Sequence, residues 1–175
     1  MLFRSKTEKF TIAEGFDGTA PWAQAANGNV NNLPEPDQSR ARRTANFYEP
    51  LELQKSYVRM TVTGIEKVNG RDSYVISAIP SGDSIERLYF DVQTGLLNRK
   101  WSSLPTVLGP FPQQIDYFDY KKTPNGVMFP YTIRSVPGTP RVEPTANSTL
   151  QITDLKENVA IEASRFVRPT PPPKK

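Results

Sequence analysis

RLYFDVQTGLLNRKW, residues 87–101, contains two short apolar runs that flank Gly95. The segment Gln93-Thr94-Gly95 fits a three-residue hairpin loop, in which a type I turn is followed by a glycine in the left-handed conformation. We therefore predict that this stretch forms a β-hairpin, which is the repeating unit of an antiparallel sheet.

The predicted loop fixes the pairing of the two strands and so sorts their side chains onto two faces. One face carries the pairs Val92–Leu96, Phe90–Asn98 and Leu88–Lys100, and the other carries Asp91–Leu97, Tyr89–Arg99 and Arg87–Trp101. The first face holds most of the apolar bulk and is expected to face a core. The second is amphipathic and has two interpretations. We favour a solvated face stabilised by cross-strand pairs over one wall of a groove that binds an elongated apolar ligand or partner.

Turn signals recur about every ten residues along the chain, which is typical of an antiparallel all-β domain. The 17 prolines and 10 glycines include a strong two-residue hairpin signal at Asn69-Gly70 and a turn at Pro124-Asn125-Gly126. About eight strands are expected, over residues 9–16, 58–67, 72–79, 85–92, 96–101, 114–122, 127–135 and 149–157, with a short additional strand around Trp22. The strand over 9–16 is expected to have no partner before it.

The remaining segments predict one or two helices and several loops. Asp37 is placed to cap a helix over residues 38–47, and residues 51–57 form a second helical or extended piece. Loops are expected over the Asn/Gly/Pro-rich residues 27–36, the Pro-interrupted residues 102–113 and the polar residues 137–147. The end, PTPPPKK, predicts a disordered polyproline tail.

Composition excludes several functions. The chain has no Cys and no His, which removes disulfides, thiolate nucleophiles, His-based triads and zinc sites built on these residues. The net charge of +4 is too weak to predict nucleic-acid binding, and the cluster Arg40, Arg42 and Arg43 is expected to be a solvated helix face. No apolar run approaches the ~20 residues of a membrane span. We expect no cofactor and no metal.

Carboxylates are the remaining candidates for acid–base chemistry. Asp116 and Asp119 are three residues apart on one predicted strand, so they point to opposite faces and do not form a general acid/base pair. Both are expected to be solvated surface charges. Asp91 is a third carboxylate, whose position relative to these two is left open by the sequence.

Four motifs in order resemble bacterial LolA-like proteins of the outer-membrane lipoprotein-sorting superfamily. They are EGFDGTAPW (14–22), TVTGIEKVNGRDSYVISAIP (61–80), RLYFDVQTGLLNRKW (87–101) and QIDYFDYKKTPNGVMFPYTIR (114–134). Within this superfamily the chain looks most like the C-terminal region of acidobacterial proteins related to reaction-centre cytochrome c subunits. The resemblance implies a mainly β, α+β fold: a strongly curved antiparallel half-barrel wrapped around one or two helices, from which the first strands of the family are missing.

The resemblance also implies a periplasmic, non-catalytic module that holds a lipid, a lipoprotein or another apolar ligand in the concave face. Apolar and aromatic side chains are the candidates to line it: Trp22, Tyr57, Met60, Tyr89, Trp101, Tyr117 and Tyr131. The alternative is a structural domain with a filled interior that docks an envelope protein or a cytochrome-type redox partner. An enzyme built on Arg, Tyr and carboxylate side chains is a third possibility. A monomer is expected.

The same resemblance places the half-barrel domain at residues 9–169, between a non-native or partial segment at 1–8 and the tail at 170–175. Because residues 1–8 contain no signal peptide, we expect the natural protein to begin upstream, with a leader that this chain has lost.

Overall fold

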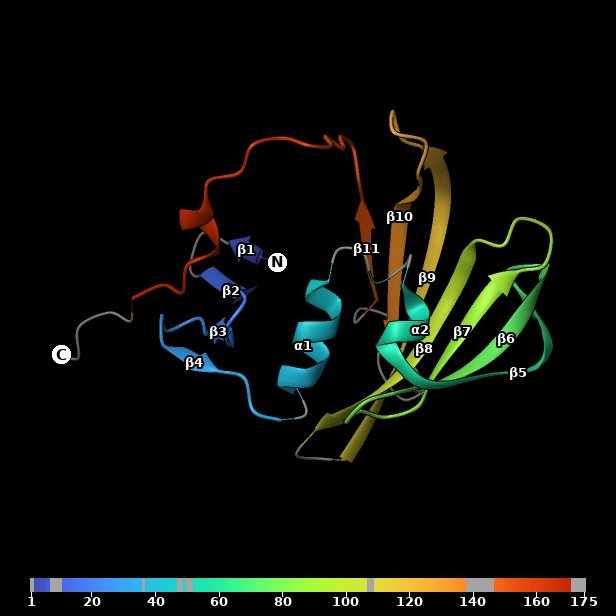
Figure 1. Ribbon diagram of the computed structural model, residues 1–175, viewed down its shortest axis with the longest axis horizontal. Helices are drawn as coiled ribbons and strands as arrows, with labels where there is room; N and C mark the ends of the chain where they lie inside the picture. The colour runs from blue at the N-terminus through green and yellow to red at the C-terminus, as the bar shows by residue number, and fades with distance from the viewer. Residues whose placement is uncertain are drawn as a thin grey trace. The chain divides into compact units, whose positions relative to one another are not determined.

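The computed structural model describes residues 2–6, 11–35, 37–46, 49, 52–106, 109–137 and 147–170 (Figure 1). The described residues form eleven β-strands, two α-helices and a short 3-10 helix. The fold is therefore mainly β with antiparallel sheets, as the sequence predicts, although it has more strands than the expected eight. The chain separates into two compact units, Met1–Ser56 with Val159–Lys175, and Tyr57–Asn158.

The first unit contains a four-stranded antiparallel sheet in the order β1-β2-β3-β4. Its strands are β1 (Leu2–Lys6), β2 (Thr11–Phe16), β3 (Pro21–Gln24) and β4 (Val30–Asn32). Two sequence expectations are corrected here. The strand expected to lack a preceding partner is paired with β1. Residues 27–36 are not all loop, because β4 pairs with β3 after the turn at Gly28 (φ 84°).

The core of the first unit forms around Trp22, which is 1% exposed and packs with Ala13 and Val30. Gly15 lies directly against the indole: a Cβ atom at this position would be 2.4 Å from Trp22 Cζ2. The sheet can therefore pack this large ring only because residue 15 has no side chain. The indole Nε1 has no hydrogen-bond partner among the described residues.

Helices and the C-terminal segment complete the first unit. The helix α1 (Asp37–Ala45) lies next to β2 and β3, and α2 (Leu53–Ser56) is a single turn. Near the other end, the 3-10 helix η3 (Ala163–Phe166) precedes Arg168, whose Nη2 donates to the carbonyl of Val30 at 3.0 Å and whose Nη1 donates to Asn32 Oδ1. These bonds join the C-terminal segment to β4.

The predicted basic helix face is paired with carboxylates. Arg40 Nη1 lies 3.2 Å from Asp37 Oδ1, Arg42 Nη1 lies 3.5 Å from Glu35 Oε1, and Arg43 Nε lies 3.7 Å from Glu49 Oε1. Asp37 is the acidic residue of the first helical turn, where it complements the helix dipole. The cluster is thus neutralised locally, although the Arg43 side chain is only 9% exposed and not solvated as expected.

The second unit is a seven-stranded antiparallel sheet in which each strand pairs with its neighbours in sequence (Figure 1). It comprises β5 (Tyr57–Val68), β6 (Arg71–Pro80), β7 (Glu86–Asp91), β8 (Leu97–Thr106), β9 (Gly109–Lys122), β10 (Met128–Pro137) and β11 (Ser148–Gln151). The turns agree with the sequence: Asn69 and Gly70 both have positive φ, 50° and 82°, as a two-residue hairpin requires.

The hairpin of residues 87–101 has the predicted glycine conformation, but its loop has four residues, 92–95, and not three, and only three of the six predicted pairs form. Gly95 has φ 70°. The predicted pairs that form are Arg87–Trp101, Leu88–Lys100 and Tyr89–Arg99. The pairing then shifts, so Phe90 lies opposite Leu97 and not Asn98. The extra residue is a β-bulge, and the loop closes by the bond from Asp91 N to Leu96 O at 2.8 Å.

The predicted loop over 102–113 is wrong, because β8 and β9 continue as a two-stranded ribbon. Pro105 lies opposite Pro110, and Ser103 opposite Pro112. In this ribbon β8 has no pairing with β7 beyond Trp101, and β9 has none with β10 before Gln113. A proline tolerates such an edge, where its missing N–H need not join a ladder.

At the other edge, the predicted strand over 149–157 ends early. The strand β11 stops at Gln151, although Ile152 N still donates to Tyr131 O at 2.8 Å. The polar residues 138–146, the tail residues 171–175 and residues 47–48 of the predicted helix end lie outside the described residues.

The described strands form no closed or strongly curled sheet, so the half-barrel is not confirmed by the fold. What is established is an antiparallel, mainly β architecture with few helices.

Candidate functional site

Asp91 is the centre of a hydrogen-bonded hub at the β7–β8 turn. Its side chain is 1% exposed, and Oδ1 accepts the N–H groups of Gln93 at 3.0 Å and Thr94 at 2.7 Å, and the Thr94 hydroxyl at 2.9 Å. Oδ2 accepts from Asn98 Nδ2 at 3.3 Å and lies 2.7 Å from Arg71 Nε. Burial by itself raises the pKa of Asp91, but the bonds from Thr94 and Asn98 and the charge of Arg71 together lower it to about 2.

The β-bulge gives Asn98 its place in this hub. Its amide donates to both Asp91 Oδ2 and the hydroxyl of Ser73, at 3.3 and 3.1 Å. Ser73 is fully buried on β6. The shift in pairing therefore joins three strands, β6, β7 and β8, through one amide side chain.

Asp116 forms a second buried charge cluster, which corrects the expectation of a solvated carboxylate. It is 0% exposed, Arg99 Nε and Nη2 donate to it at 2.5 and 3.2 Å, and Arg134 Nη2 donates at 2.8 Å. Gln114 also donates to both oxygens. Burial raises the pKa of Asp116, but the hydrogen bonds from the two arginines outweigh it, so the pKa is lowered. Arg99, Asp116 and Arg134 are neighbours on β8, β9 and β10.

A third buried carboxylate, Glu86, is 3% exposed. The Tyr57 hydroxyl donates to its Oε2 at 2.6 Å, and Lys100 Nζ lies 2.8 Å from the same atom. The three buried carboxylates of the sheet thus each have a cationic partner. Among the described residues, no group of three acidic side chains is placed to hold a metal ion.

The amphipathic face of the 87–101 hairpin is not the solvated face that the sequence favoured. Tyr89 is 7% exposed and packs with Val68 and Val75, and Trp101 covers this cluster. Arg87 remains exposed, with its guanidinium carbon 5.9 Å from the Trp101 ring centroid. The aromatic side chains of this face belong to a small core, and the arginine forms a cation–π contact over it.

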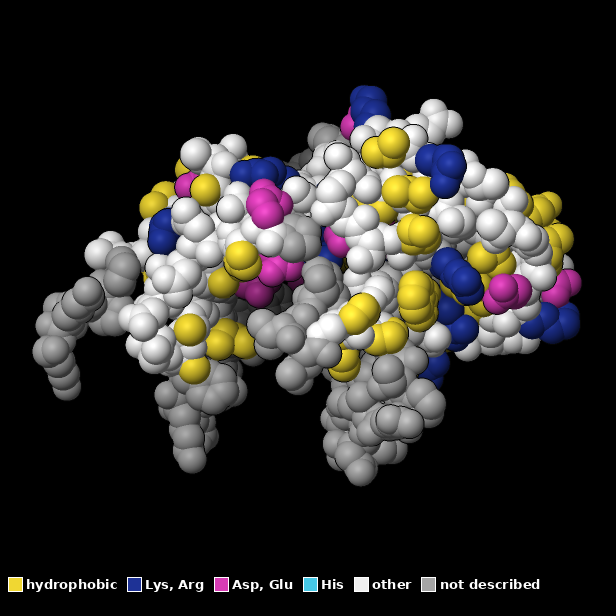
Figure 2. Space-filling model, turned by 90° about the horizontal axis from the view of Figure 1, so that it is seen from below, with side chains coloured by type: hydrophobic (Ala, Val, Ile, Leu, Met, Phe, Trp, Pro, Cys, Tyr) yellow, Lys and Arg dark blue, Asp and Glu magenta, His cyan; other side chains and the backbone are white. Residues whose placement is uncertain are grey.

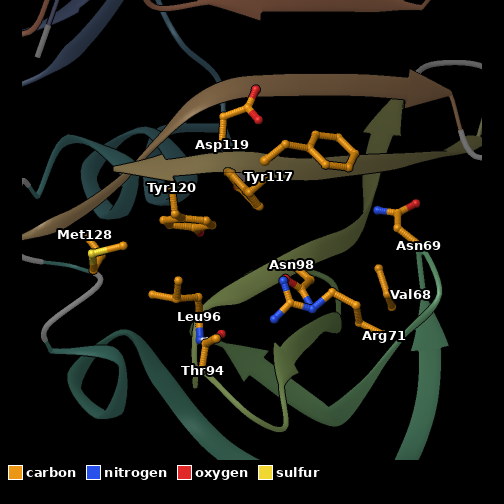
Figure 3. A pocket seen from close by; sticks show the side chains of 11 residues that line it. Val68, Asn69, Arg71, Thr94, Leu96, Asn98, Tyr117, Asp119, Tyr120 and Met128 are labelled. Carbon is orange, nitrogen blue, oxygen red and sulfur yellow. Dashed lines mark hydrogen bonds between the residues drawn. The ribbon is translucent and has the colours of Figure 1, made fainter. Parts of the chain in front are cut away.

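A pocket of about 350 Å³ lies within the second unit, beside this core and the Asp91 hub (Figure 3). It is bounded by the β5–β6 turn, the β7–β8 turn with the start of β8, and the β9–β10 hairpin. Six lining residues are apolar or aromatic: Val68, Leu96, Tyr117, Phe118, Tyr120 and Met128. The other five are polar: Asn69, Arg71, Thr94, Asn98 and Asp119. The site is therefore amphipathic.

The polar groups of the pocket differ in how they are held. Figure 3 shows Arg71 beside Asn98, while the Asp119 carboxylate points away from them. Asp119 has φ 52°, and the hydroxyl of Thr132 donates to its Oδ2 at 2.5 Å. The Tyr120 hydroxyl donates to the carbonyl of Leu97 at 2.8 Å, and burial raises its pKa to about 12. Tyr120 is thus a neutral, structural member of the wall.

Arg71 also lines a smaller cavity of about 220 Å³, together with Asp72, Asp91 and Gln93. Arg71 thus contributes to the lining of two cavities.

The structure brings some of the predicted ligand-binding residues together and separates others. Tyr117 lines the 350 Å³ pocket, and Tyr89 and Trp101 share the adjoining core. Tyr57 binds Glu86, and Met60 lies on β5 opposite Ala78.

The other two predicted residues lie elsewhere. Tyr131 on β10 packs edge-on with Phe129 and has Lys121 Nζ 4.4 Å above its ring. Trp22 is the core of the four-stranded unit. Ligand contact by all seven stays a prediction.

The polar members of the pocket were missed by sequence reasoning. One signal was present: the spacing of Asp91 and Thr94 in DVQTG is that of a carboxylate that accepts the N–H groups of its own turn. Nothing in the sequence places Arg71 next to that turn, because the contact depends on the pairing of β6 with β7.

The fold of this chain is similar to that of a domain described as an outer-membrane lipoprotein-sorting protein from Vibrio parahaemolyticus, over 94% of this chain and 79% of that chain, with a TM-score of 0.54 and 19% identity. This similarity shows a fold shared with that lipoprotein-sorting domain.

Two further solved structures overlap less closely. A DUF1329 family protein from Desulfovibrio piger matches 75% of this chain and 61% of that chain, with a TM-score of 0.47 and 15% identity. A LolA superfamily protein from Nitrosomonas europaea matches 91% of this chain and 70% of that chain, with a TM-score of 0.49 and 13% identity. No protein-family model and no curated protein matches the sequence. Among the described residues, no helix is long and apolar enough to cross a bilayer.

Proposed function

We propose that this chain is a periplasmic, non-catalytic binding domain that holds a lipid, a lipoprotein or another apolar ligand on its seven-stranded sheet. The observation that carries the proposal is the pocket of about 350 Å³ with six apolar or aromatic lining residues. This volume is at the lower end of the range of about 300–1,000 Å³ for small-molecule sites. The fold similarity to a lipoprotein-sorting domain supports the same function.

We further propose that the sheet curves into a half-barrel and that the predicted aromatic residues contribute to its ligand-contacting surface. Tyr117 is the strongest of these candidates because it lines the pocket. The buried carboxylates support a binding role over an enzymatic one, since each is neutralised by an Arg or Lys and so is poorly suited to accept a proton.

Co-purification tests this proposal. Protein purified from a periplasmic extract and extracted into organic solvent should release a lipid in stoichiometric amount, identified by mass spectrometry. The loss of Tyr117 contacts in Tyr117→Ala should reduce the lipid recovered. The absence of any lipid, together with an unchanged melting temperature on addition of lipid, would contradict the carrier function.

A second candidate function is an interaction domain that docks an envelope or cytochrome-type redox partner. It is favoured by the edge strand β5, where Val58, Val62 and Ile65 are 75%, 61% and 57% exposed. Figure 2 shows hydrophobic side chains at the surface of this part of the sheet. An exposed edge strand with apolar side chains is a template for pairing with another strand. Crosslinking from a photoreactive residue at position 62 would identify such a partner, whereas an unlinked chain in the native extract would argue against it.

A further inference from the structure

The guanidinium of Arg71 is held in place before any ligand binds. Arg71 begins β6, directly after the turn in which Asn69 and Gly70 have positive φ. Its Nε lies 2.7 Å from Asp91 Oδ2, and the Asp91 side chain is only 1% exposed. Because Asp91 is itself fixed by the N–H groups of Gln93 and Thr94, the position of the Arg71 head is set by the β7–β8 turn. Pre-organisation of this kind lowers the entropy cost of binding.

The Nη groups of Arg71 remain able to donate. An arginine has five N–H donors, and the ion pair with Asp91 is made through Nε, 2.7 Å from Asp91 Oδ2. Among the described residues, Asp91 is the only ionic partner of Arg71, and the side chain is 53% exposed. The two Nη groups can therefore bind a planar anion through two parallel hydrogen bonds.

An apolar surface lies beside this head. Val68, Leu96, Phe118 and Met128 line the same pocket as Arg71. In Figure 3, Leu96 and Met128 lie on the side of the pocket away from the β5–β6 turn that carries Val68 and Asn69. Met128 is 40% exposed, so the apolar end of the pocket opens toward solvent. A ligand with its head at Arg71 has room for an alkyl chain along this surface.

The charge of the pocket limits the charge of the head. Among the described residues of the lining, Arg71 is the one cationic side chain and Asp119 the one carboxylate. Asp119 points away and is bonded to Thr132, but its charge still opposes a head of charge −2. Arg71 is moreover already paired with the carboxylate of Asp91. A monoanion matches this balance better than a dianion.

From these contacts we propose that the pocket binds an amphiphile with a monoanionic head, of which a fatty-acid carboxylate is the simplest, and that Arg71 is the residue that binds the head. This inference rests on the proposed function and specifies the class of its ligand.

Calorimetric titration with three probes of equal chain length tests the inference: decanoate, decanol and decyltrimethylammonium. The wild-type chain should bind decanoate at least about tenfold more tightly than either other probe, since a charge-assisted bidentate contact forms only with the carboxylate. Arg71→Gln should remove this preference, so that decanoate and decanol bind alike. Arg59→Gln, which removes an exposed arginine of β5 outside the pocket, should leave it intact.

Two further variants keep the result interpretable if Arg71→Gln unfolds. Arg71→Lys keeps the charge but not the planar fork, and should lose most of the preference with the fold retained. Met128→Asp, at a partly exposed position of the apolar end, should weaken decanoate and decanol together.

The outcomes separate the two proposals. Equal binding of decanoate and decanol by the wild-type chain, or an undiminished preference in Arg71→Gln and Arg71→Lys, would overturn the role of Arg71 and leave the apolar carrier standing. Failure of all three probes to bind would overturn both.

Discussion

The two units of the chain stabilise their sheets by different means. The four-stranded unit packs around one indole: Trp22 is buried against Ala13, Val30 and the bare backbone of Gly15, and its N–H has no partner among the described residues. The seven-stranded unit also has a small apolar cluster, but it buries Glu86, Asp91 and Asp116 as well. Each of these carboxylates is held by a cation and by hydrogen bonds.

The difference explains where a binding site can form. An apolar core built around one large ring is filled by that ring. In the seven-stranded unit the Asp91 hub fixes the β7–β8 turn and the head of Arg71 beside an open pocket. Buried charges must be paired to be tolerated. The ion pair of Arg71 with Asp91 is made through Nε, and the Nη groups of this pocket-lining residue have no ionic partner among the described residues.

Removal of the Trp22 ring should cause the largest loss of stability. Trp22→Ala leaves a cavity in the middle of the four-stranded unit, so we expect a loss of about 3–5 kcal/mol in the free energy of unfolding. Urea denaturation followed by circular dichroism measures the loss, and hydrogen exchange should locate it in β2, β3 and β4. Ile161→Ala, at a position that is 54% exposed in the same unit, is the control. A similar loss in both variants would show that Trp22 is not the core of this unit.

Neutralisation of Asp116 should have the next largest effect. Asp116→Asn leaves Arg99 and Arg134 facing each other without a countercharge, and breaking a buried pair typically costs about 3–5 kcal/mol. Since the Arg134 side chain is 43% exposed, water screens part of this, and we expect about 2–4 kcal/mol. The matched control is Asp119→Asn on the same strand, where the carboxylate is exposed. Equal unfolding midpoints for the two variants would contradict a stabilising role of the buried network.

A methyl group at Gly15 tests the tight contact of the first unit. Gly15→Ala places its Cβ within 2.4 Å of Trp22 Cζ2, so we expect a loss of about 1–3 kcal/mol from overpacking. Trp22→Phe removes the contacted part of the ring, and Gly15→Ala should cost less in that background. A double-mutant cycle measures this coupling, and strict additivity of the two changes would show that the contact does not limit residue 15.

Loss of the Arg168 contact should have a smaller effect on stability. Arg168→Ala removes the bonds to Val30 and Asn32, and a net hydrogen-bond contribution predicts about 0.5–1.5 kcal/mol. Faster proteolysis after residue 158, compared with the exposed control Lys156→Ala, would report release of the segment from β4. Unchanged proteolysis would mean that other contacts hold it.

Acid should weaken the second unit through Asp91, with no effect at neutral pH. The pKa of Asp91 is lowered to about 2 in the folded chain, below the ordinary value of about 3.9. The folded state therefore binds fewer protons than the unfolded state between these values, and the stabilisation present above about pH 4 is lost as the pH falls toward 2. Melting temperatures measured from pH 6 to 2 should fall less steeply in Asp91→Asn than in the wild type. Parallel curves would rule out this contribution.

Local signals in the sequence predicted the hairpins because turn chemistry acts over a few residues. Asn69, Gly70 and Gly95 have positive φ, as their residue types favour. The pair Arg87–Trp101 was also predicted, but it forms because the β-bulge at Asn98 offsets the extra residue of the loop. The β-bulge at Asn98 was not predictable in this way, because its amide is held by Ser73, 25 residues away. The strands over 102–113 were missed because prolines normally mark loops, whereas here they lie in a ribbon that, among the described residues, pairs with no further strand.

Turn residues and composition are enough to predict an antiparallel, mainly β chain without thiol or imidazole chemistry. The burial of particular carboxylates and the position of the pocket depend on strand pairing, which the sequence does not reveal. Asp116 meets Arg99 and Arg134 across strands, 17 and 18 residues away, and Arg71 meets Asp91 only because β6 pairs with β7. The cations that pair with these carboxylates lie on neighbouring strands, so the sequence alone does not show that the carboxylates are paired and buried.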